Sequence, residues 1–84
     1  MNKFLVTFIV PELDMEFEIY IPNNKKIGTI KKYFLKTLNE QTNNMYHKDV
    51  NQVVVIDKQT GKKYLNDIYV KDTDIKNGSK LIFI

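Results

Sequence analysis

The sequence lacks several residue types, and each absence excludes a class of function. No cysteine occurs among the 84 residues, so disulfides, thiolate metal sites and a cysteine nucleophile are excluded. Arginine is also missing, and all 13 basic residues are lysines. Lysine is a point charge that cannot make the bidentate contacts of arginine with guanine or phosphate. Since the net charge is only +3, no specific nucleic-acid partner is expected.

Candidate catalytic and metal-binding side chains are equally scarce. The one histidine, His47, lies in a polar stretch with no further ligands placed to complete a metal site. The one serine, Ser79, is far from it in the sequence and has no base partner. The glycines are isolated and do not form a phosphate-binding motif. The sequence therefore predicts no enzyme activity, no cofactor and no metal site.

Long hydrophobic runs are absent as well. The N-terminal run over residues 4–10 is far shorter than the roughly 20 residues that span a bilayer. Pro11 and Glu12 follow it, rather than a small-residue cleavage site. We therefore expect a cytoplasmic protein without a transmembrane segment or a secretory signal. An 84-residue chain with 43% apolar and 27% charged residues is predicted to form a single domain over residues 1–84.

Hydrophobic periodicity predicts five strands and one helix. Residues 3–10 are almost continuously apolar and residues 15–21 alternate between apolar and polar, which is typical of a hairpin. Apolar residues at three- and four-residue steps predict a helix over residues 26–40, with Asn24 as its cap and a polar loop after it over residues 41–51. Short apolar segments predict the remaining strands over residues 52–56, 62–65 and 80–84.

The element order is therefore β-β-α-β-β-β. The first and last strands are the most apolar, so we expect them side by side at the centre of a mixed sheet. One helix would then pack on one face of that sheet. This arrangement is an α+β fold of the β-grasp type.

The core spacing resembles that of the ubiquitin-like superfamily. The spacing of Ile21, Ile27, Ile30 and Phe34 matches that from ubiquitin's second strand into its helix. The spacing of Val70, Ile75, Leu81 and Phe83 matches that leading into ubiquitin's last strand. The resemblance implies a ubiquitin-like β-grasp.

Within that superfamily, the chain most resembles the small bacterial YukD/EsaB-like proteins of type VII secretion systems. The shared features are Val6-Thr7, Ile21-Pro22 and Asn66-Asp67. This resemblance implies a cytoplasmic accessory or regulatory protein that binds other proteins, with membrane-bound secretion machinery as a partner. Conjugated superfamily members act through a Gly-Gly tail, whereas no glycine follows Gly78 here. We therefore expect an adaptor that is not conjugated.

Strand alternation also places apolar side chains on the sheet face away from the helix. Leu5, Thr7 and Ile9, Val54 and Ile56, and Ile82 and Ile84 would point outward. Monomers seldom expose a large continuous apolar patch unless it binds something. The predicted anchor for a protein partner consists of Leu5, Val54, Ile82 and Ile84. The same stripe could join two copies into a homodimer, or long Lys and Tyr side chains could cover it.

Charge is unevenly distributed along the chain. Residues 11–20 contain only acidic charges and residues 21–36 only basic ones. We expect Lys31, Lys32 and Lys36 on the helix to orient an acidic partner. An alternative function is binding of an anionic surface, either nucleic acid or lipid headgroups, through the same helix. Charges that serve solubility alone are the third interpretation.

Overall fold

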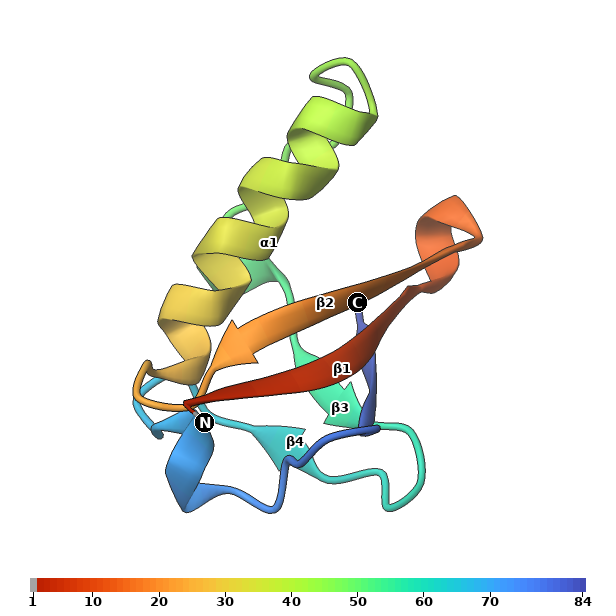
Figure 1. The fold of residues 1–84 in the computed structure, drawn as a ribbon. Helices are drawn as coiled ribbons and strands as arrows, with labels where there is room; N and C mark the ends of the chain where they lie inside the picture. Colours follow the sequence, from red (N-terminus) through yellow and green to blue (C-terminus); the bar gives the residue numbers. More distant parts are fainter. Residues whose placement is uncertain (1) are drawn as a thin grey trace.

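Residues 2–84, which the computed structural model describes, form a five-stranded sheet with a helix packed on one face (Figure 1). The strand order is β2-β1-β5-β3-β4. β1 and β5 are parallel, and the other neighbouring strands are antiparallel. The elements are β1 (Lys3–Val10), β2 (Met15–Pro22), α1 (Ile27–Gln41), β3 (Val55–Asp57), β4 (Lys63–Tyr64) and β5 (Lys80–Phe83). The predicted α+β ubiquitin-like β-grasp is confirmed.

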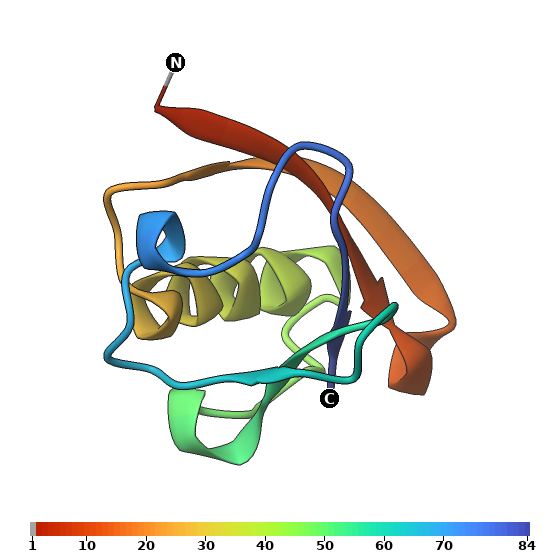
Figure 2. The ribbon, with the colours of Figure 1, turned by 90° about the horizontal axis from the view of Figure 1, so that it is seen from below.

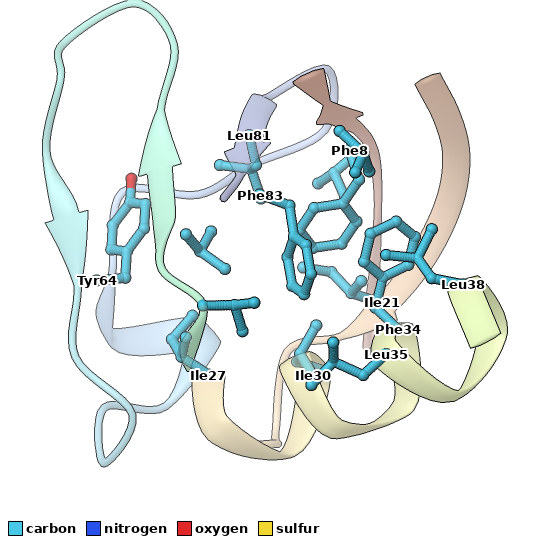
Figure 3. Packing of buried hydrophobic residues seen from close by; sticks show 14 of the residues in the cluster. Phe8, Ile21, Ile27, Ile30, Phe34, Leu35, Leu38, Tyr64, Leu81 and Phe83 are labelled. Atoms are coloured by element: carbon cyan, nitrogen blue, oxygen red, sulfur yellow. The ribbon is translucent and has the colours of Figure 1, made fainter. Parts of the chain in front are cut away.

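The core lies between α1 and the concave side of the sheet. The Phe34 ring of α1 stacks on Phe8 of β1 with 4.4 Å between centroids, and it meets Phe83 of β5 edge-on at 4.9 Å. Figure 3 shows these rings packed with the isoleucine and leucine side chains of α1. Because Phe8 and Phe83 come from β1 and β5, neighbouring strands in the middle of the sheet, this cluster fixes which face of the sheet α1 covers. Edge-to-face and offset ring pairs add to the hydrophobic stabilisation of such a core.

The start of α1 differs from the prediction. Asn24 does not cap the helix; Lys26 occupies the N-cap position and makes no side-chain capping bond. Instead, the amides of Ile27 and Gly28 donate to the carbonyls of Ile68 and Asn66, both at 2.9 Å. Backbone from the segment after β4 thus satisfies amides that a helix start leaves open. No helix among residues 2–84 has the length and apolarity needed to cross a membrane.

The segment between α1 and β3 is more ordered than a polar loop. Val50–Gln52 form a 3₁₀ turn, capped by Asp49, so β3 begins at Val55 rather than at residue 52. Tyr46, from the predicted loop 41–51, is only 7% exposed and belongs to the core cluster. The loop therefore supplies one large core side chain.

Candidate functional site

The sheet face opposite α1 carries a continuous row of isoleucines. The flanking residues on each strand, such as Phe8 and Leu81, point into the core, so Ile9, Ile82 and Ile56 point away from it. Strand register places Ile9 beside Ile82, and Ile82 opposite Ile56. The row thus crosses β1, β5 and β3, the three middle strands of the sheet.

A second apolar pair extends this row. Val54 and Ile84 exchange two backbone hydrogen bonds of 2.7 and 3.1 Å, which makes their side chains neighbours on the same face. Ile84 is 39% exposed and Val54 is half-buried. We use the name open-face patch for the set Ile9, Val54, Ile56, Ile82 and Ile84.

The structure brings together three of the four predicted anchor residues. Val54, Ile82 and Ile84 lie in the open-face patch, whereas Leu5 lies on the same face but further along β1. The Thr7–Lys80 pair separates Leu5 from the isoleucine row. Leu5 is held there by backbone bonds of 2.8 Å with the Asn77 side chain and the Gly78 amide. Ile9 and Ile56 complete the patch, as strict alternation along the strands indicates.

The helix lysines do not lie beside this patch. Lys32 and Lys36 are exposed on α1, which covers the opposite face of the sheet, so one small footprint cannot include both sets.

The expectation that Lys31 orients a partner is wrong, because its side chain is only 3% exposed. Residue 31 lies four positions after Ile27 and four before Leu35, on the inward side of the helix. Burial lowers the pKa of its ammonium.

Charged residues flank the open-face patch on both sides. Glu16 lies beside Ile9 at the β2 edge, and Lys63 lies opposite Ile56 at the β4 edge. In the next outward row, two residues along each strand, Glu18 lies opposite Thr7. Lys80 of the central strand β5 lies on the other side of Thr7. The patch therefore has an acidic border and a basic border.

These border charges are available to a partner. Glu16, Glu18, Lys63 and Lys80 are exposed. Within the described residues, ion pairing is confined to Lys48 and Glu12. The sequence interpretation missed the basic border, although Lys80 shares the strand parity of Ile82 and Ile84 and so could have been found.

A separate polar cluster surrounds Tyr64 on β4. Its buried hydroxyl donates a 2.6 Å hydrogen bond to Oδ1 of Asp74 and lies 3.5 Å from Oδ2 of Asp57. Burial and the Asp74 carboxylate raise the pKa of Tyr64, while the hydroxyl lowers the pKa of Asp74. Tyr64 is thus kept protonated, which suits a structural hydrogen bond rather than a base. Among residues 2–84, no three His, Asp or Glu side chains gather to hold a metal ion.

Solved structures share this fold at low sequence identity. The N-terminal ubiquitin-like domain of the 4931431F19Rik protein superposes with a TM-score of 0.75 at 20% identity, covering 99% of this chain and 74% of that one. The ubiquitin-like domain of an Arabidopsis thaliana protein superposes with a TM-score of 0.71 at 12% identity, covering 100% of this chain and 78% of that one. A chain of the ESX-5 inner membrane complex superposes with a TM-score of 0.78 at 11% identity, covering 100% of this chain but 21% of that one. The sequence itself matches no protein-family model and no curated protein. The chain thus has the fold of ubiquitin-like domains.

Proposed function

We propose that this domain is a non-covalent protein-interaction module and that the open-face patch is its binding surface. The observation that carries the proposal is the unbroken row of Ile9, Ile82 and Ile56 on the sheet face that no helix covers. A partner that covers this row would remove apolar surface from water, which is the main driving force of association.

The surroundings of the patch support the same proposal. Specific interfaces commonly have an apolar centre and a polar rim that stays partly solvated. Here the apolar residues occupy the middle strands, and charged side chains such as Glu16 and Lys63 occupy the edges. We propose that these border charges, and not those of α1, orient the partner.

We further propose that the domain acts by binding alone, without catalysis or a cofactor. What supports this is the state of its most strongly perturbed titratable group. The raised pKa of Tyr64 keeps its proton on the hydroxyl, which is bonded to Asp74. A general base needs a pKa near the working pH instead.

The narrower setting we propose is a cytoplasmic adaptor or accessory component of a type VII secretion system. Its support is the sequence resemblance to YukD/EsaB-like proteins. A chain of the ESX-5 inner membrane complex also contains a domain of this fold as about a fifth of its length. A fold of this kind therefore occurs within a membrane-embedded assembly.

An Ile82→Asp variant tests the binding surface. Ile82 is half-buried on the open face, so a carboxylate there would be desolvated by any bound partner. We expect partner affinity to fall about 30-fold or more, as for a central hot-spot residue. The measurement is quantitative capture of proteins from an extract of the source cells, followed by titration of the purified partner.

Met45→Asp is the matched control. Met45 is an apolar residue that is 81% exposed in the loop after α1, away from the open-face patch. Both variants should keep the wild-type far-ultraviolet circular dichroism spectrum, and Met45→Asp should keep the captured proteins. The patch proposal is wrong if Ile82→Asp captures the same proteins as Met45→Asp.

Binding of an anionic surface through α1 is the second candidate. Lys32 and Lys36 are exposed on the helix and could contact phosphates, whereas Lys31 could not. This function predicts association with anionic lipid vesicles or single-stranded nucleic acid that weakens steeply with salt. A Lys32→Glu/Lys36→Glu variant should abolish that association but keep protein capture through the patch.

A further inference from the structure

We propose that a second copy of this chain is a partner of the open-face patch, related to the first by a two-fold axis parallel to β5. The inference rests on the proposed function, because it uses the same surface. It adds the identity of a partner, which the row of isoleucines alone does not specify.

The charge pattern of the face is what points to a second copy. Across the sheet, one row of outward side chains runs Glu16, Ile9, Ile82, Ile56, Lys63. This row has an acid at one end, a base at the other and Ile82 of the central strand in the middle. The next row begins with Glu18 on β2, passes Thr7 and reaches Lys80 on β5. It ends at Lys58, whose amide donates to the Lys80 carbonyl at 2.9 Å. The first row changes sign about β5. The second row is acidic on β2 and basic from β5 to Lys58, so that Lys80 lies on the central strand itself.

A surface with the antisymmetry of the first row is complementary to itself along that row. Rotation by half a turn about an axis along β5 turns the sheet over and exchanges its two edges, but it keeps each residue at the same level along the strands. Glu16 of one copy then faces Lys63 of the other, and Glu18 faces the Lys58 side. Ile82 packs against its own counterpart on the axis. Lys80 also meets its own counterpart there, and the two flexible lysine side chains must point away from each other. In such an isologous contact every charge pair forms twice.

The same charges disfavour the other face-to-face arrangement. An axis across the strands would place Glu16 on Glu16 and Lys63 on Lys63, which is repulsive. The arrangement with the axis along β5 also keeps the strands of the two sheets nearly aligned, as in β-sandwiches, where the sheets cross at about 30°. Charge therefore selects one orientation.

The curvature of the sheet limits the size of this contact. Figure 2 shows the sheet curving around α1, with β1 and β2 on one side of the helix and β3 and β4 on the other. The apolar contact is therefore centred on β5, and the flexible Glu and Lys side chains reach across at its flanks. Contacts that bury less than about 1,200 Å² in total are typical of weak, transient association. We expect a dimer that depends on concentration and weakens as salt screens its border pairs.

Zero-length carbodiimide cross-linking of the wild-type protein tests the orientation. Glu16 and Lys63 are four strand steps apart within one copy, or about 19 Å at about 4.8 Å per step. An amide bond between them can therefore form only between two copies. We expect a cross-linked dimer whose mass spectra contain the Glu16–Lys63 link, with a yield that falls with added salt.

Two charge-reversed variants test the complementarity. Glu16→Lys/Glu18→Lys gives a face with two basic borders, and Lys58→Glu/Lys63→Glu gives one with two acidic borders. Each alone should self-associate about tenfold or more weakly than wild type in sedimentation equilibrium, because each substitution acts twice. An equimolar mixture should regain wild-type association as a heterodimer. All four positions are exposed, so both variants should keep the wild-type melting curve.

The outcomes separate this inference from the proposed function. Wild-type protein that stays monomeric at its highest soluble concentration, or a dimer without the Glu16–Lys63 link, overturns the second-copy inference. In either case, loss of a captured protein on Ile82→Asp would still uphold the open-face patch as a binding surface. A dimer that the mixture of variants restores, and that Ile82→Asp abolishes, supports the inference.

Discussion

The ammonium nitrogen of Lys31 lies 2.6 Å from Oδ1 of Asn66, and this hydrogen bond joins the second turn of α1 to the segment that follows β4. The carbonyl of Val50 is a second, longer acceptor at 3.4 Å. Asn66 also accepts the Gly28 amide through its backbone carbonyl. One asparagine thus holds α1 at two successive turns.

Removal of the Asn66 side chain should destabilise the domain more than removal of the buried charge. Asn66→Ala leaves the Lys31 ammonium without its short acceptor, and we expect the free energy of unfolding to fall by about 1–3 kcal/mol. Lys31→Met removes the charge but keeps an apolar chain of similar length, so its effect should be smaller. Urea unfolding of both single variants and of the double variant gives the coupling free energy between the Lys31 and Asn66 side chains. Equal losses for the two single variants would contradict this account.

The unfavourable contribution of Lys31 to stability should become smaller as the pH rises toward 10.5. Burial lowers its folded-state pKa below the ordinary value of 10.5. Between these two values the unfolded chain binds more protons, so the free energy of unfolding increases with pH. The unfavourable contribution is fully present below the folded-state pKa and has gone above 10.5. The difference in stability between wild type and Lys31→Met, measured by urea unfolding at increasing pH, should follow this course; a difference independent of pH would refute it.

Gly28→Ala should destabilise the domain even though alanine favours helices. A Cβ at residue 28 would meet both Cβ and the carbonyl oxygen of Asn66 at 3.2 Å. That oxygen is fixed by its hydrogen bond from the Gly28 amide, so the contact cannot relax without loss of the bond. We expect a loss of about 1–3 kcal/mol from overpacking, against a gain of about 1 kcal/mol from helix propensity.

Thermal unfolding measures the balance for Gly28→Ala. Gly61→Ala is a useful comparison, because nothing lies within 4 Å of its added Cβ and only its positive φ of 76° opposes the change. A rise in melting temperature for Gly28→Ala would show that the segment around Asn66 moves to accommodate the added Cβ, which would contradict the prediction.

Two tyrosine hydroxyls should differ in their contribution to stability. Tyr64→Phe removes the 2.6 Å bond to Asp74 and should lower the free energy of unfolding by about 1 kcal/mol. It should also return the lowered pKa of Asp74 toward its usual range, which a carboxyl-carbon NMR titration detects. Tyr46→Phe is the comparison, because its buried hydroxyl makes no hydrogen bond of normal geometry among the described residues, although Glu12 and Lys48 lie close enough to influence its pKa. Its loss should therefore cost less than that of the Tyr64 hydroxyl. A greater loss for Tyr46→Phe would reverse this assignment.

The fold could be predicted because its local patterns agree with its packing. Residues 15–21 alternate in sequence, and the strand Met15–Pro22 does pair along its whole length with β1. Phe34 and Leu38 fall on the helical stripe and are buried at 2% and 0% exposure. At such positions the hydrophobic period of the sequence coincides with burial in the structure, because a strand or helix of this size buries one face.

The missed features depend on contacts that are distant in sequence. Lys31 has the composition of a surface residue, and only Asn66 and Val50 explain why its charge lies inside. Asn24 was a reasonable cap by residue type, but the carbonyl of Ile68 reaches the first helical amide instead. The separation of the helix lysines from the open-face patch likewise follows from the side of the sheet on which α1 packs, not from their spacing along the chain.

The position of β5 between β1 and β3 also governs how the domain can fold. The β1–β2 hairpin and the β3–β4 pair touch the same strand but not each other within the sheet. They become one sheet only when residues 80–83 insert between them, with Lys80 pairing to Thr7 near the other end of the described chain. Closure over so long a separation is slow relative to local pairing. A nascent chain should therefore gain cooperative stability only after residues 80–83 have been synthesised and have paired with β1 and β3.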